Sequence, residues 1–506
     1  MTSDAVDLTT LARTLRTHAS ARPAAPAVTS AAARRTYAEL ADDVARTAAS
    51  LRRAGLRPGD RFVVAARNSA DYVRLLYAAS WSGAVLVCLN WRLAPQEAAA
   101  VLADSEPRLV FAEREWATLV DDGREVIWLD EGRLAQWSDA DPVPIHPDHG
   151  EASIVLQMYT TGTTGAAKGV QLSERNVRHM CDQACRAWLM HPRMSFLAVL
   201  PFFHVSGLSS VITCVHSGGQ VVVPAGASVQ DIGTAVQEHR VTHTVLVPTV
   251  LSSLVRDDAA SSYDLSSLEV LIYGSAPSGS SLVEQAMAML PSTGFSQGYG
   301  LTETSAGVAI APVLRHGDVD PAPGSVGRIN PNCEARIVDP ATGEDLPPGL
   351  DGELWLRTEQ LTPGYWRKPE LTSAAIDQDG WFRTGDIGSF DEAGHLWIRD
   401  RLKDMIISGG ENIYSVEVEN EVAGHPDVVE CAVVGVPHET WGETVKAVVV
   451  RERGSSLTEE SLMEHLQDRL ARYKQPRVVE FVDELPRTGS GKILKRRLRR
   501  EVVSHG

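Results

Sequence analysis

The first third of the chain alternates between two patterns of hydrophobic positions. Apolar residues spaced three and four positions apart predict helices over residues 37–54 and 69–81. Short continuous apolar runs at residues 61–66 and 83–89 predict buried strands. Such alternation is typical of a mostly parallel sheet covered by helices, and similar units follow over residues 196–290. The pattern therefore predicts an α/β fold.

The pattern of hydrophobic positions changes in the second half of the chain. Residues 323–399 carry short strand signals between Gly and Pro turns, which predict a small β-rich subdomain. Further strands are predicted at residues 428–436, 444–450 and 477–482. A capping box of Ser456 and Glu459 predicts a helix that carries Leu462, Leu466 and Leu470 on one face. We therefore expect an N-terminal domain over residues 1–400, which includes the β-rich subdomain, and a small, mobile α+β domain over residues 401–506.

Composition and charge exclude several classes of protein. The 506 residues carry a net charge of −17, which argues against a nucleic-acid binder or a general binder of anionic membranes. The first 30 residues lack an apolar signal region, and no run of 18 apolar residues occurs, so no membrane span is expected. The six cysteines are dispersed without metal-ligand spacing, which favours a reducing, cytoplasmic location.

Residues 160–169, TTGTTGAAKG, carry the strongest local signal, between a predicted strand at 153–159 and a predicted helix from about residue 173. Glycines let backbone N–H groups turn toward phosphate oxygens, hydroxyls add donors, and Lys168 adds a charge. A Walker A loop has Gly before its Lys and Ser or Thr after it, whereas Ala167 and Gly169 flank Lys168. Because the chain has only seven lysines, a Lys in this segment favours a phosphate loop over a polar turn.

The loop resembles the signature loop of the adenylate-forming superfamily of acyl-CoA synthetases, luciferases and peptide-synthetase adenylation domains. Thr161 stands where the usual form has Ser, and Ala167 where it has Pro. The resemblance continues over about residues 11–500, is closest to bacterial acyl-CoA ligases of the fatty-acid type, and implies ATP, Mg²⁺ and coenzyme A as cofactors. In the loop it implies nucleotide contacts by Thr160, Thr161, Gly162, Thr163, Thr164, Gly165 and Lys168.

Two later motifs are similar to the nucleotide-binding segments of this superfamily. GYGLTET at residues 298–304 implies that Tyr299 packs on adenine, Thr302 contacts the α-phosphate and Glu303 holds Mg²⁺. A hard cation is usually bound by one or two carboxylates with phosphates and water. IYGSAP at residues 272–277 resembles the adenine-binding turn. Together they imply further nucleotide contacts by Gly274, Ser275, Ala276, Pro277, Gly298, Tyr299 and Gly300.

The following motifs resemble the ribose-binding and interdomain segments. WFRTGDIG at residues 381–388 implies that the carboxylate of Asp386 accepts hydrogen bonds from the ribose hydroxyls. The segment at residues 394–414 implies nucleotide contacts by Ile398 and Arg401 and a hinge at Lys403. It also implies a tunnel for the thiol arm of coenzyme A, lined by Ser408, Gly409, Gly410 and Glu411.

PRTGSGK at residues 486–492 matches the C-terminal motif of the superfamily. The resemblance implies that Lys492 is catalytic, because its charge can stabilise the pentavalent α-phosphate. Thr302, Glu303 and His204 complete the implied catalytic set. The basic run at residues 495–500 is interpreted as a solvated helix face.

The acid-binding pocket is implied by PFFHVSG at residues 201–207, which resembles the pocket wall of the superfamily. Peptide-synthetase domains carry an Asp where this chain has His204, and that Asp pairs with a substrate ammonium group. An α-amino acid is therefore disfavoured. A packed His204 without a chemical role is an equal alternative. The pocket residues implied are His204, Val205, Ser206, Tyr273 and Ser305.

The resemblance implies an AMP-forming acid–CoA ligase that converts an aromatic or a medium- or long-chain carboxylic acid to acyl-AMP and then to a thioester. Alternatives keep adenylation but change the acid or the acceptor, which becomes a carrier-protein thiol, oxygen or an amine, or nitrite is activated for diazotisation. A catalytically silent ATP-binding protein is a remote alternative. The expected partners are a small-molecule acid and an acyl carrier protein, and the oligomeric state is left open between monomer and homodimer.

Overall fold

The computed structural model describes residues 7–121, 123–161, 167–274, 280–409, 411–487 and 493–499. The chain divides into two compact units. The first contains Met1–Glu334 and Arg357–Phe382, and the second contains Ala335–Leu356 and Arg383–Gly506. The division of function between residues 1–400 and a mobile domain over residues 401–506 stays a prediction.

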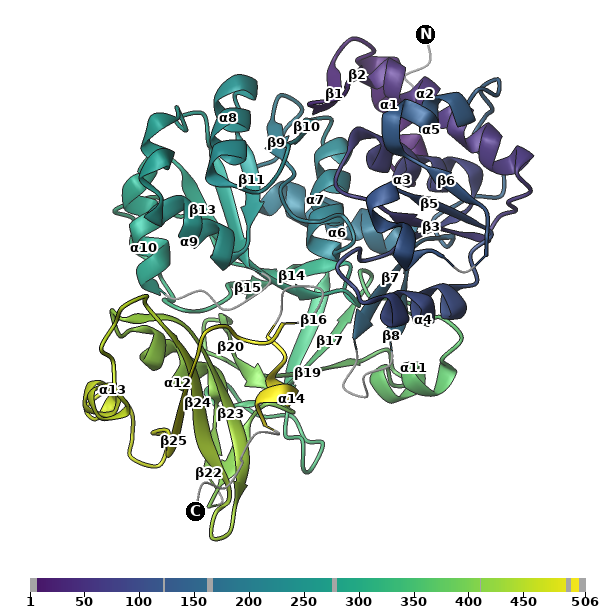
Figure 1. Cartoon of the computed structure of the whole chain (residues 1–506). Coiled ribbons are helices and arrows are strands. Elements are labelled where there is room, and N and C mark those ends of the chain that lie inside the picture. Colours follow the sequence, from purple (N-terminus) through teal and green to yellow (C-terminus); the bar gives the residue numbers. More distant parts are fainter. Residues whose placement is uncertain are drawn as a thin grey trace. The chain divides into compact units, whose positions relative to one another are not determined.

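A nine-stranded sheet forms one half of the first unit, in the order β15-β14-β13-β12-β11-β9-β10-β1-β2 (Figure 1). Its central strands pair in parallel, as the alternating pattern predicts, whereas β14 and β15 extend the sheet antiparallel. The strands are β1 (Pro26–Ser30), β2 (Arg34–Thr36), β9 (Ser195–Leu197), β10 (Gln220–Val223), β11 (His243–Leu246), β12 (Val270–Gly274), β13 (Gly294–Leu301), β14 (Ala306–Ile310) and β15 (Arg328–Ile329).

A seven-stranded sheet forms the other half of the first unit, in the order β18-β8-β7-β4-β3-β5-β6. Its inner strands β3 and β4 are almost wholly buried, which explains why they read as continuous apolar runs. The strands are β3 (Arg61–Ala65), β4 (Val85–Cys88), β5 (Leu109–Ala112), β6 (Val126–Trp128), β7 (Ile154–Thr161), β8 (Ala167–Ser173) and β18 (Gly364–Tyr365).

Helices pack between and outside these two sheets (Figure 1). One large core joins α1, α2, α3, α6 and α7 to both sheets, and a second core packs α8, α9 and α10 on the nine-stranded sheet. The predicted helices at residues 37–54 and 69–81 are confirmed as α2 and α3. The helices are α1 (Leu11–Ala21), α2 (Tyr37–Arg53), α3 (Ala70–Ser82), α4 (Pro95–Ser105), α5 (Arg133–Trp137), α6 (Glu174–Ala187), α7 (Val205–His216), α8 (Val229–His239), α9 (Pro248–Arg256), α10 (Ser280–Met289) and α11 (Pro369–Ala375), with 3₁₀ turns η1 (Arg114–Leu119), η2 (Asp130–Gly132) and η3 (Asp258–Ser262).

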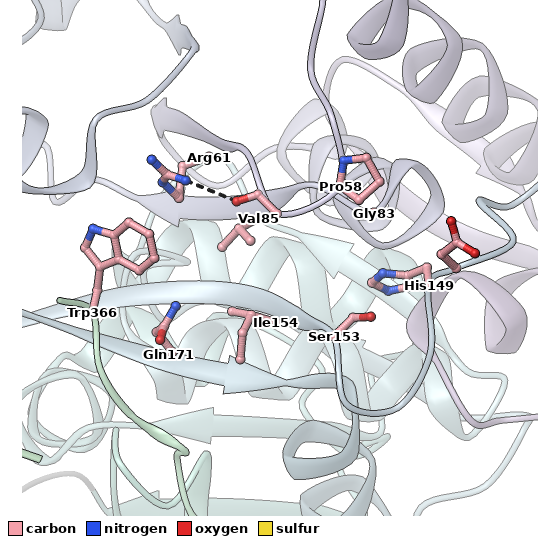
Figure 2. Close-up of a pocket in the computed structure, with 11 residues that line it drawn as sticks. Pro58, Arg61, Gly83, Val85, His149, Ser153, Ile154, Gln171 and Trp366 are labelled. Carbon is pink, nitrogen blue, oxygen red and sulfur yellow. Dashed lines mark hydrogen bonds between the residues drawn. The ribbon is translucent and has the colours of Figure 1, made fainter. Parts of the chain in front are cut away.

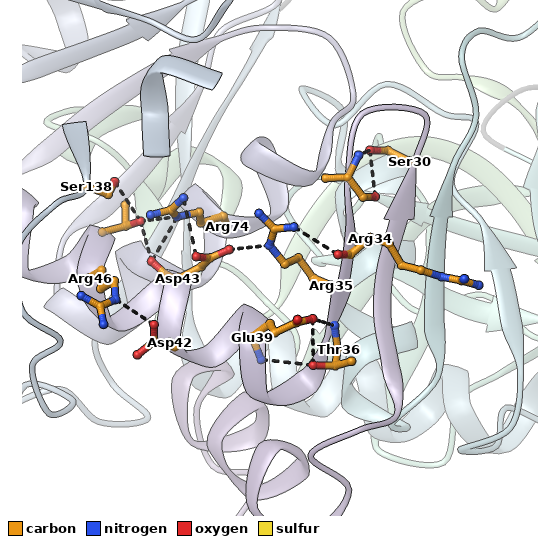
Figure 3. A network of polar contacts seen from close by, with 12 residues as sticks. Ser30, Arg34, Arg35, Thr36, Glu39, Asp42, Asp43, Arg46, Arg74 and Ser138 are labelled. Carbon is orange, nitrogen blue, oxygen red and sulfur yellow. Dashed lines mark hydrogen bonds and ion pairs between the residues drawn. The ribbon is translucent and has the colours of Figure 1, made fainter. Parts of the chain in front are cut away.

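A polar network joins α2 to its neighbours (Figure 3). Thr36 and Glu39 form the capping box that starts the helix. One turn later, the Asp43 carboxylate pairs with Arg35 at 2.7 Å. The guanidinium of Arg74, which is 4% exposed, donates to the Asp43 carbonyl at 3.0 Å. The helix is thereby tied both to β2 and to α3.

The second unit holds a sheet in which β22, β21, β24 and β23 follow one another and β25 pairs with β24. A four-stranded sheet, β16-β17-β19-β20, lies mostly in this unit and supplies the predicted small β-rich part. The strands are β16 (Cys333–Val338), β17 (Gly352–Thr358), β19 (Phe382–Phe390), β20 (Leu396–Arg401), β21 (Ile406–Ser408), β22 (Glu411–Ile413), β23 (Val428–His438), β24 (Gly442–Arg451) and β25 (Val478–Val482).

The second unit also holds α12 (Ser415–Ala423), α13 (Glu459–Leu466) and α14 (Lys495–Leu498). The predicted capping box is wrong by two residues, because Thr458 caps α13 and Ser461 completes the box. Leu462, Leu466 and Leu470 are buried as the pattern predicts. Among the described residues, no helix is long and apolar enough to cross a membrane.

Candidate active site

The predicted phosphate loop connects two paired strands of the first unit. Thr160 near the end of β7 lies opposite Lys168 near the start of β8, in an antiparallel pair that extends to Thr161. Gly162, Thr163, Thr164 and Gly165 lie outside the described residues. The helix predicted from about residue 173 begins at Glu174, after the intervening strand β8. The hairpin therefore fixes both ends of the loop.

Lys168 and Glu303 meet at one aromatic side chain, Tyr365. The Lys168 ammonium lies 5.2 Å from the centroid of the Tyr365 ring. The Tyr365 hydroxyl donates to Glu303 Oε1 at 2.9 Å, and the backbone N–H of Thr362 donates to the Glu303 carbonyl at 2.7 Å. Burial, reinforced by Glu303, raises the pKa of Tyr365, so its hydroxyl stays a donor. Tyr365 was absent from the sequence-based site, although it follows Gly364 in a predicted turn-rich region.

Glu303 fits the magnesium role that the motif implies. Among the described residues, no group of three or more His, Cys, Asp or Glu side chains could hold a metal ion. A Mg²⁺ ion bound with a nucleotide does not need such a group, because phosphates and water fill most of its coordination sphere. A single carboxylate, oriented through one oxygen by Tyr365, is consistent with that chemistry.

The adenine-binding motifs lie at the ends of two paired strands. Gly274 ends β12 directly beside Gly298 of β13. A Cβ atom at Gly274 would lie only 2.5 Å from the Gly298 carbonyl oxygen, and one at Gly300 would overlap the Ala306 carbonyl oxygen. These backbones approach as closely as glycine allows. Tyr299 lies between Gly298 and Gly300, while Ser275, Ala276 and Pro277 are outside the described residues.

The turn after β13 brings Thr302 and Glu303 close to the implied pocket residue Ser305. The Thr304 hydroxyl donates to the carbonyls of Leu301 and Ala306, at 3.1 and 2.8 Å. Ser305 has a φ of +59° and donates to the Gln360 carbonyl at 2.9 Å. The turn therefore connects the antiparallel pair of β13 and β14 and is also held by buried hydroxyls.

His204, Val205 and Ser206 stand at the start of α7. His204 is the N-cap residue, and its ring lies 4.5 Å from that of Phe203. Its backbone N–H donates to the Pro201 carbonyl at 3.0 Å. A Cβ at Gly207 would come within 2.2 Å of the same carbonyl oxygen, so this turn requires glycine. The partly exposed His204 is thereby held at a defined place.

Trp188 and Tyr273 are two aromatic residues near the paired strands β12 and β13, and only Tyr273 was predicted from the motifs. The Trp188 indole donates to Ser296 Oγ at 3.1 Å and lies over Gly298, 3.2 Å from the place of an added Cβ. It also passes near Gly307. Burial, assisted by Asp320, raises the pKa of Tyr273 to about 12, so the phenol is neutral at pH 7. Trp188 was missed because no local motif marks it.

Asp386 and Arg401 pair within the second unit. They lie opposite each other on β19 and β20, and Arg401 Nε is 2.7 Å from Asp386 Oδ1. The Asp386 side chain is 6% exposed, whereas that of Arg401 is 45% exposed. Ile398 lies opposite Gly388 on the same strand pair. The arrangement presents a fixed carboxylate beside a cation that remains accessible.

The predicted hinge and tunnel residues follow on the same unit. Lys403 is exposed in the turn after β20. Ser408 pairs with Glu411 across β21 and β22. Gly409 has a φ of +62° and donates its N–H to the Trp441 carbonyl at 2.9 Å. Gly410 and Lys492 lie outside the described residues.

The cavity in Figure 2 is lined by residues other than the site residues described above. It has a volume of about 260 Å³ in the first unit, and the guanidinium of Arg61 at its edge lies 4.5 Å from the Trp366 ring centroid. Its lining residues are Pro58, Gly59, Arg61, Gly83, Val85, Asp148, His149, Ser153, Ile154, Gln171 and Trp366. None of these residues belongs to the set predicted from the motifs.

Comparisons with known proteins show which family and which solved structures the chain resembles. The profile of the AMP-binding enzyme matches residues 15–366, and that of the AMP-binding enzyme C-terminal domain matches residues 417–492. A feruloyl-CoA synthase from Amycolatopsis sp is 40% identical over 94% of this chain and 96% of its own length. A fatty acid–[acyl-carrier-protein] ligase, ScoC from Streptomyces coeruleorubidus, is 36% identical over 97% and 96%. The crystal structure of ATP-bound MatB from Rhodopseudomonas palustris superposes with a TM-score of 0.88 at 31% identity, over 96% of this chain and 98% of that one.

Proposed function

Because this chain belongs to the AMP-binding enzyme family and is an AMP-forming acid–CoA ligase that uses ATP, Mg²⁺ and coenzyme A, we propose that its acid is an aromatic one of the feruloyl type. The observation that carries the proposal is the Trp188 indole, which lies over Gly298 and near Gly307. The indole packs directly against this glycine backbone and provides an aromatic wall on which a planar acid can stack. The similarity to a feruloyl-CoA synthase supports the same class of acid.

The reaction has two balanced steps. A carboxylate oxygen attacks the α-phosphorus of ATP, which forms the acyl-phosphate bond and releases pyrophosphate. The thiol of coenzyme A, losing its proton, then attacks the acyl carbon and AMP leaves. Mg²⁺ supplies charge neutralisation on the phosphates when it is bound.

The chain's own residues divide this work. Thr302 contacts the α-phosphate, and Glu303, held by Tyr365, provides the carboxylate for the metal ion. Lys168 and Lys492 supply positive charge around the phosphates, and His204 lies at the substrate carboxylate. The buried Asp386 accepts the ribose hydroxyls, because an ionised carboxylate offers only acceptors.

A carrier-protein thiol is the second acceptor to consider, because a fatty acid–[acyl-carrier-protein] ligase matches nearly the whole chain. The acceptor leaves the first step unchanged and replaces coenzyme A in the second. Mass detection of the product, with coenzyme A or a phosphopantetheinylated carrier protein supplied, separates the two. For location, we propose the cytoplasm on the six free cysteines, which are typical of a reducing compartment.

The test is acid-dependent ATP–pyrophosphate exchange with hydroxycinnamic acids, octanoate, palmitate and α-amino acids. We expect kcat/KM for the hydroxycinnamic acids to exceed that for the alkyl acids by at least about tenfold. Replacing Trp188 by Leu should remove this preference, while Trp188→Phe should retain most of it as the matched control. A higher kcat/KM for an alkyl acid would contradict the aromatic assignment, and no exchange with any acid would contradict adenylation itself.

A further inference from the structure

The first two residues of the C-terminal motif are joined to the residues that directly follow the motif. Arg487 and Ile493 form an antiparallel bridge, and the Leu494 N–H donates to the Pro486 carbonyl at 2.7 Å. Arg487 also pairs with Glu430. Arg487 and Ile493, which flank the segment 488–492 that carries Lys492, are therefore held next to each other. Contacts that hold Arg487 and Ile493 in place also fix the two points from which this segment extends.

Lys495 lies three residues beyond Lys492 and is not the solvated residue that the basic run predicted. Its ammonium donates to Ser415 Oγ at 2.6 Å and lies 2.8 Å from Glu419 Oε1. The side chains of Lys495 and Glu419 are only 17% and 18% exposed. Glu419 Oε1 also accepts from the Val433 N–H at 2.8 Å. Lys495 thus joins the start of α14 to α12 and, through Glu419, to β23.

Lys446 contacts the C-terminal end of α14. Its side chain is 1% exposed, and its ammonium lies 2.6 Å from Glu480 Oε2. The same ammonium donates to the Leu498 carbonyl at 3.3 Å. The last carbonyls of a helix have no donor within the helix, so a buried cation satisfies one of them. The Leu498 side chain packs in the small core of β23 and β24.

Arg499 connects the end of α14 to the turn that contains the predicted hinge. Its guanidinium donates to the Lys403 carbonyl at 3.2 Å and to Asp404 Oδ1 at 3.0 Å. The short helix therefore lies between the base of the C-terminal motif and the hinge turn, within one compact unit. Two of the seven lysines of the chain, Lys446 and Lys495, therefore hold α14 in place.

We propose that Lys495 and Lys446 are positioning residues for the adenylation step, because they hold α14 and with it the base of the segment that carries Lys492. The inference rests on the proposed role of Lys492. A compact ammonium on a flexible stem suits both sites, since Lys495 contacts two acceptors on α12 and Lys446 contacts one on α14 and one on β25. The proposal explains why a buried cation persists in an otherwise valine-rich sheet.

The experiment compares the two half-reactions in Lys495→Met. We expect pyrophosphate exchange to fall by about tenfold to a hundredfold in kcat, because a misplaced catalytic group costs that much. Thioester formation from supplied acyl-AMP and coenzyme A, which does not use Lys492, should stay within about twofold of wild type. Hydrogen exchange of the peptide spanning residues 485–495 should become faster.

A second variant guards against misfolding. Removing Lys495 alone leaves the buried Glu419 carboxylate without its cation, which destabilises the unit. Lys495→Met combined with Glu419→Gln removes that charge and should show the same loss of pyrophosphate exchange. Lys474→Met is the matched control, because Lys474 pairs with Glu417 at 2.6 Å on the same unit and should leave both half-reactions unchanged.

Two results would overturn the proposal. One is unchanged pyrophosphate exchange in Lys495→Met. The other is an equal loss in both half-reactions together with a lowered Tm, which indicates a purely structural role. Failure of the proposed function is distinguishable, since it would show as absent acid-dependent exchange in the wild-type enzyme and in Lys474→Met alike.

Discussion

A single tyrosine side chain connects two residues that the motifs place in separate parts of the chain. Lys168 comes from the phosphate loop and Glu303 from the turn after β13, yet both contact Tyr365. A hydrogen bond to an ionised carboxylate contributes about 1.5–3 kcal/mol. Tyr365 can therefore hold one rotamer of Glu303 before the nucleotide arrives, while its ring supports the Lys168 ammonium.

Replacing Tyr365 by Phe should raise the Mg²⁺ concentration needed for half-maximal pyrophosphate exchange by about threefold to tenfold. The reason is that Glu303 loses the donor that orients it, while the ring beneath Lys168 remains. The measurement is exchange rate against Mg²⁺ at saturating ATP and acid. Tyr159→Phe is the control, since Tyr159 makes a comparable bond to Asp104 at 2.6 Å. An unchanged Mg²⁺ requirement in Tyr365→Phe would show that Glu303 does not depend on it.

At the scale of elements, the site depends on how closely two strands approach. Gly274 and Gly298 pair in register on β12 and β13, and Trp188 covers the face of Gly298. The strands end at the same edge of the sheet, where parallel α/β sheets bind ligands. The two glycines let the backbones of β12 and β13 lie close together at that edge, because any side chain at Gly274 would collide with the Gly298 carbonyl oxygen.

Gly274→Ala should therefore lower the free energy of unfolding by about 1–3 kcal/mol, because the added Cβ forces the two strands apart. ATP binding, measured by calorimetry, should weaken along with it. Gly150→Ala is the matched control, because a Cβ there meets no atom within 4 Å. Equal stability and ATP affinity in the two variants would refute the close-approach argument.

At the scale of the whole molecule, the residues that the motifs predict for nucleotide and acid binding belong to two compact units. Thr302, Glu303 and His204 belong to the first, and Asp386, Arg401 and Lys403 to the second. An enzyme that catalyses two successive steps with one set of motifs can use a hinge to change the groups presented to the intermediate. The exposed turn at Lys403 is the place that the family resemblance assigns to this hinge.

Lys403→Pro should separate the two half-reactions. Proline fixes φ near −65°, so a hinge that needs another φ in one state loses that state. We expect pyrophosphate exchange within about threefold of wild type and a loss of more than about tenfold in thioester formation from acyl-AMP. Lys403→Ala should retain both activities, because alanine keeps the backbone free. Full thioester formation by Lys403→Pro would place the hinge elsewhere.

The sequence by itself determined the α/β alternation, the order of the ATP-handling motifs and the class of reaction. Periodicity and short motifs are local properties, and helices α2 and α3 accordingly begin within a residue of their predicted starts. Strand β8 was not separated from the phosphate loop, because its Gly and Lys obscure the alternating pattern.

Only the tertiary structure decided which residues become neighbours across the sheets. Tyr365 reaches Glu303 over 62 positions, Trp188 reaches Ser296 over 108, and Lys495 reaches Ser415 over 80. Such pairs depend on strand order and on burial, which no local pattern encodes. The basic run at residues 495–500 illustrates this, because Arg496 and Arg497 are exposed as its composition predicts, whereas the fold places Lys495 beside the largely buried Glu419 carboxylate.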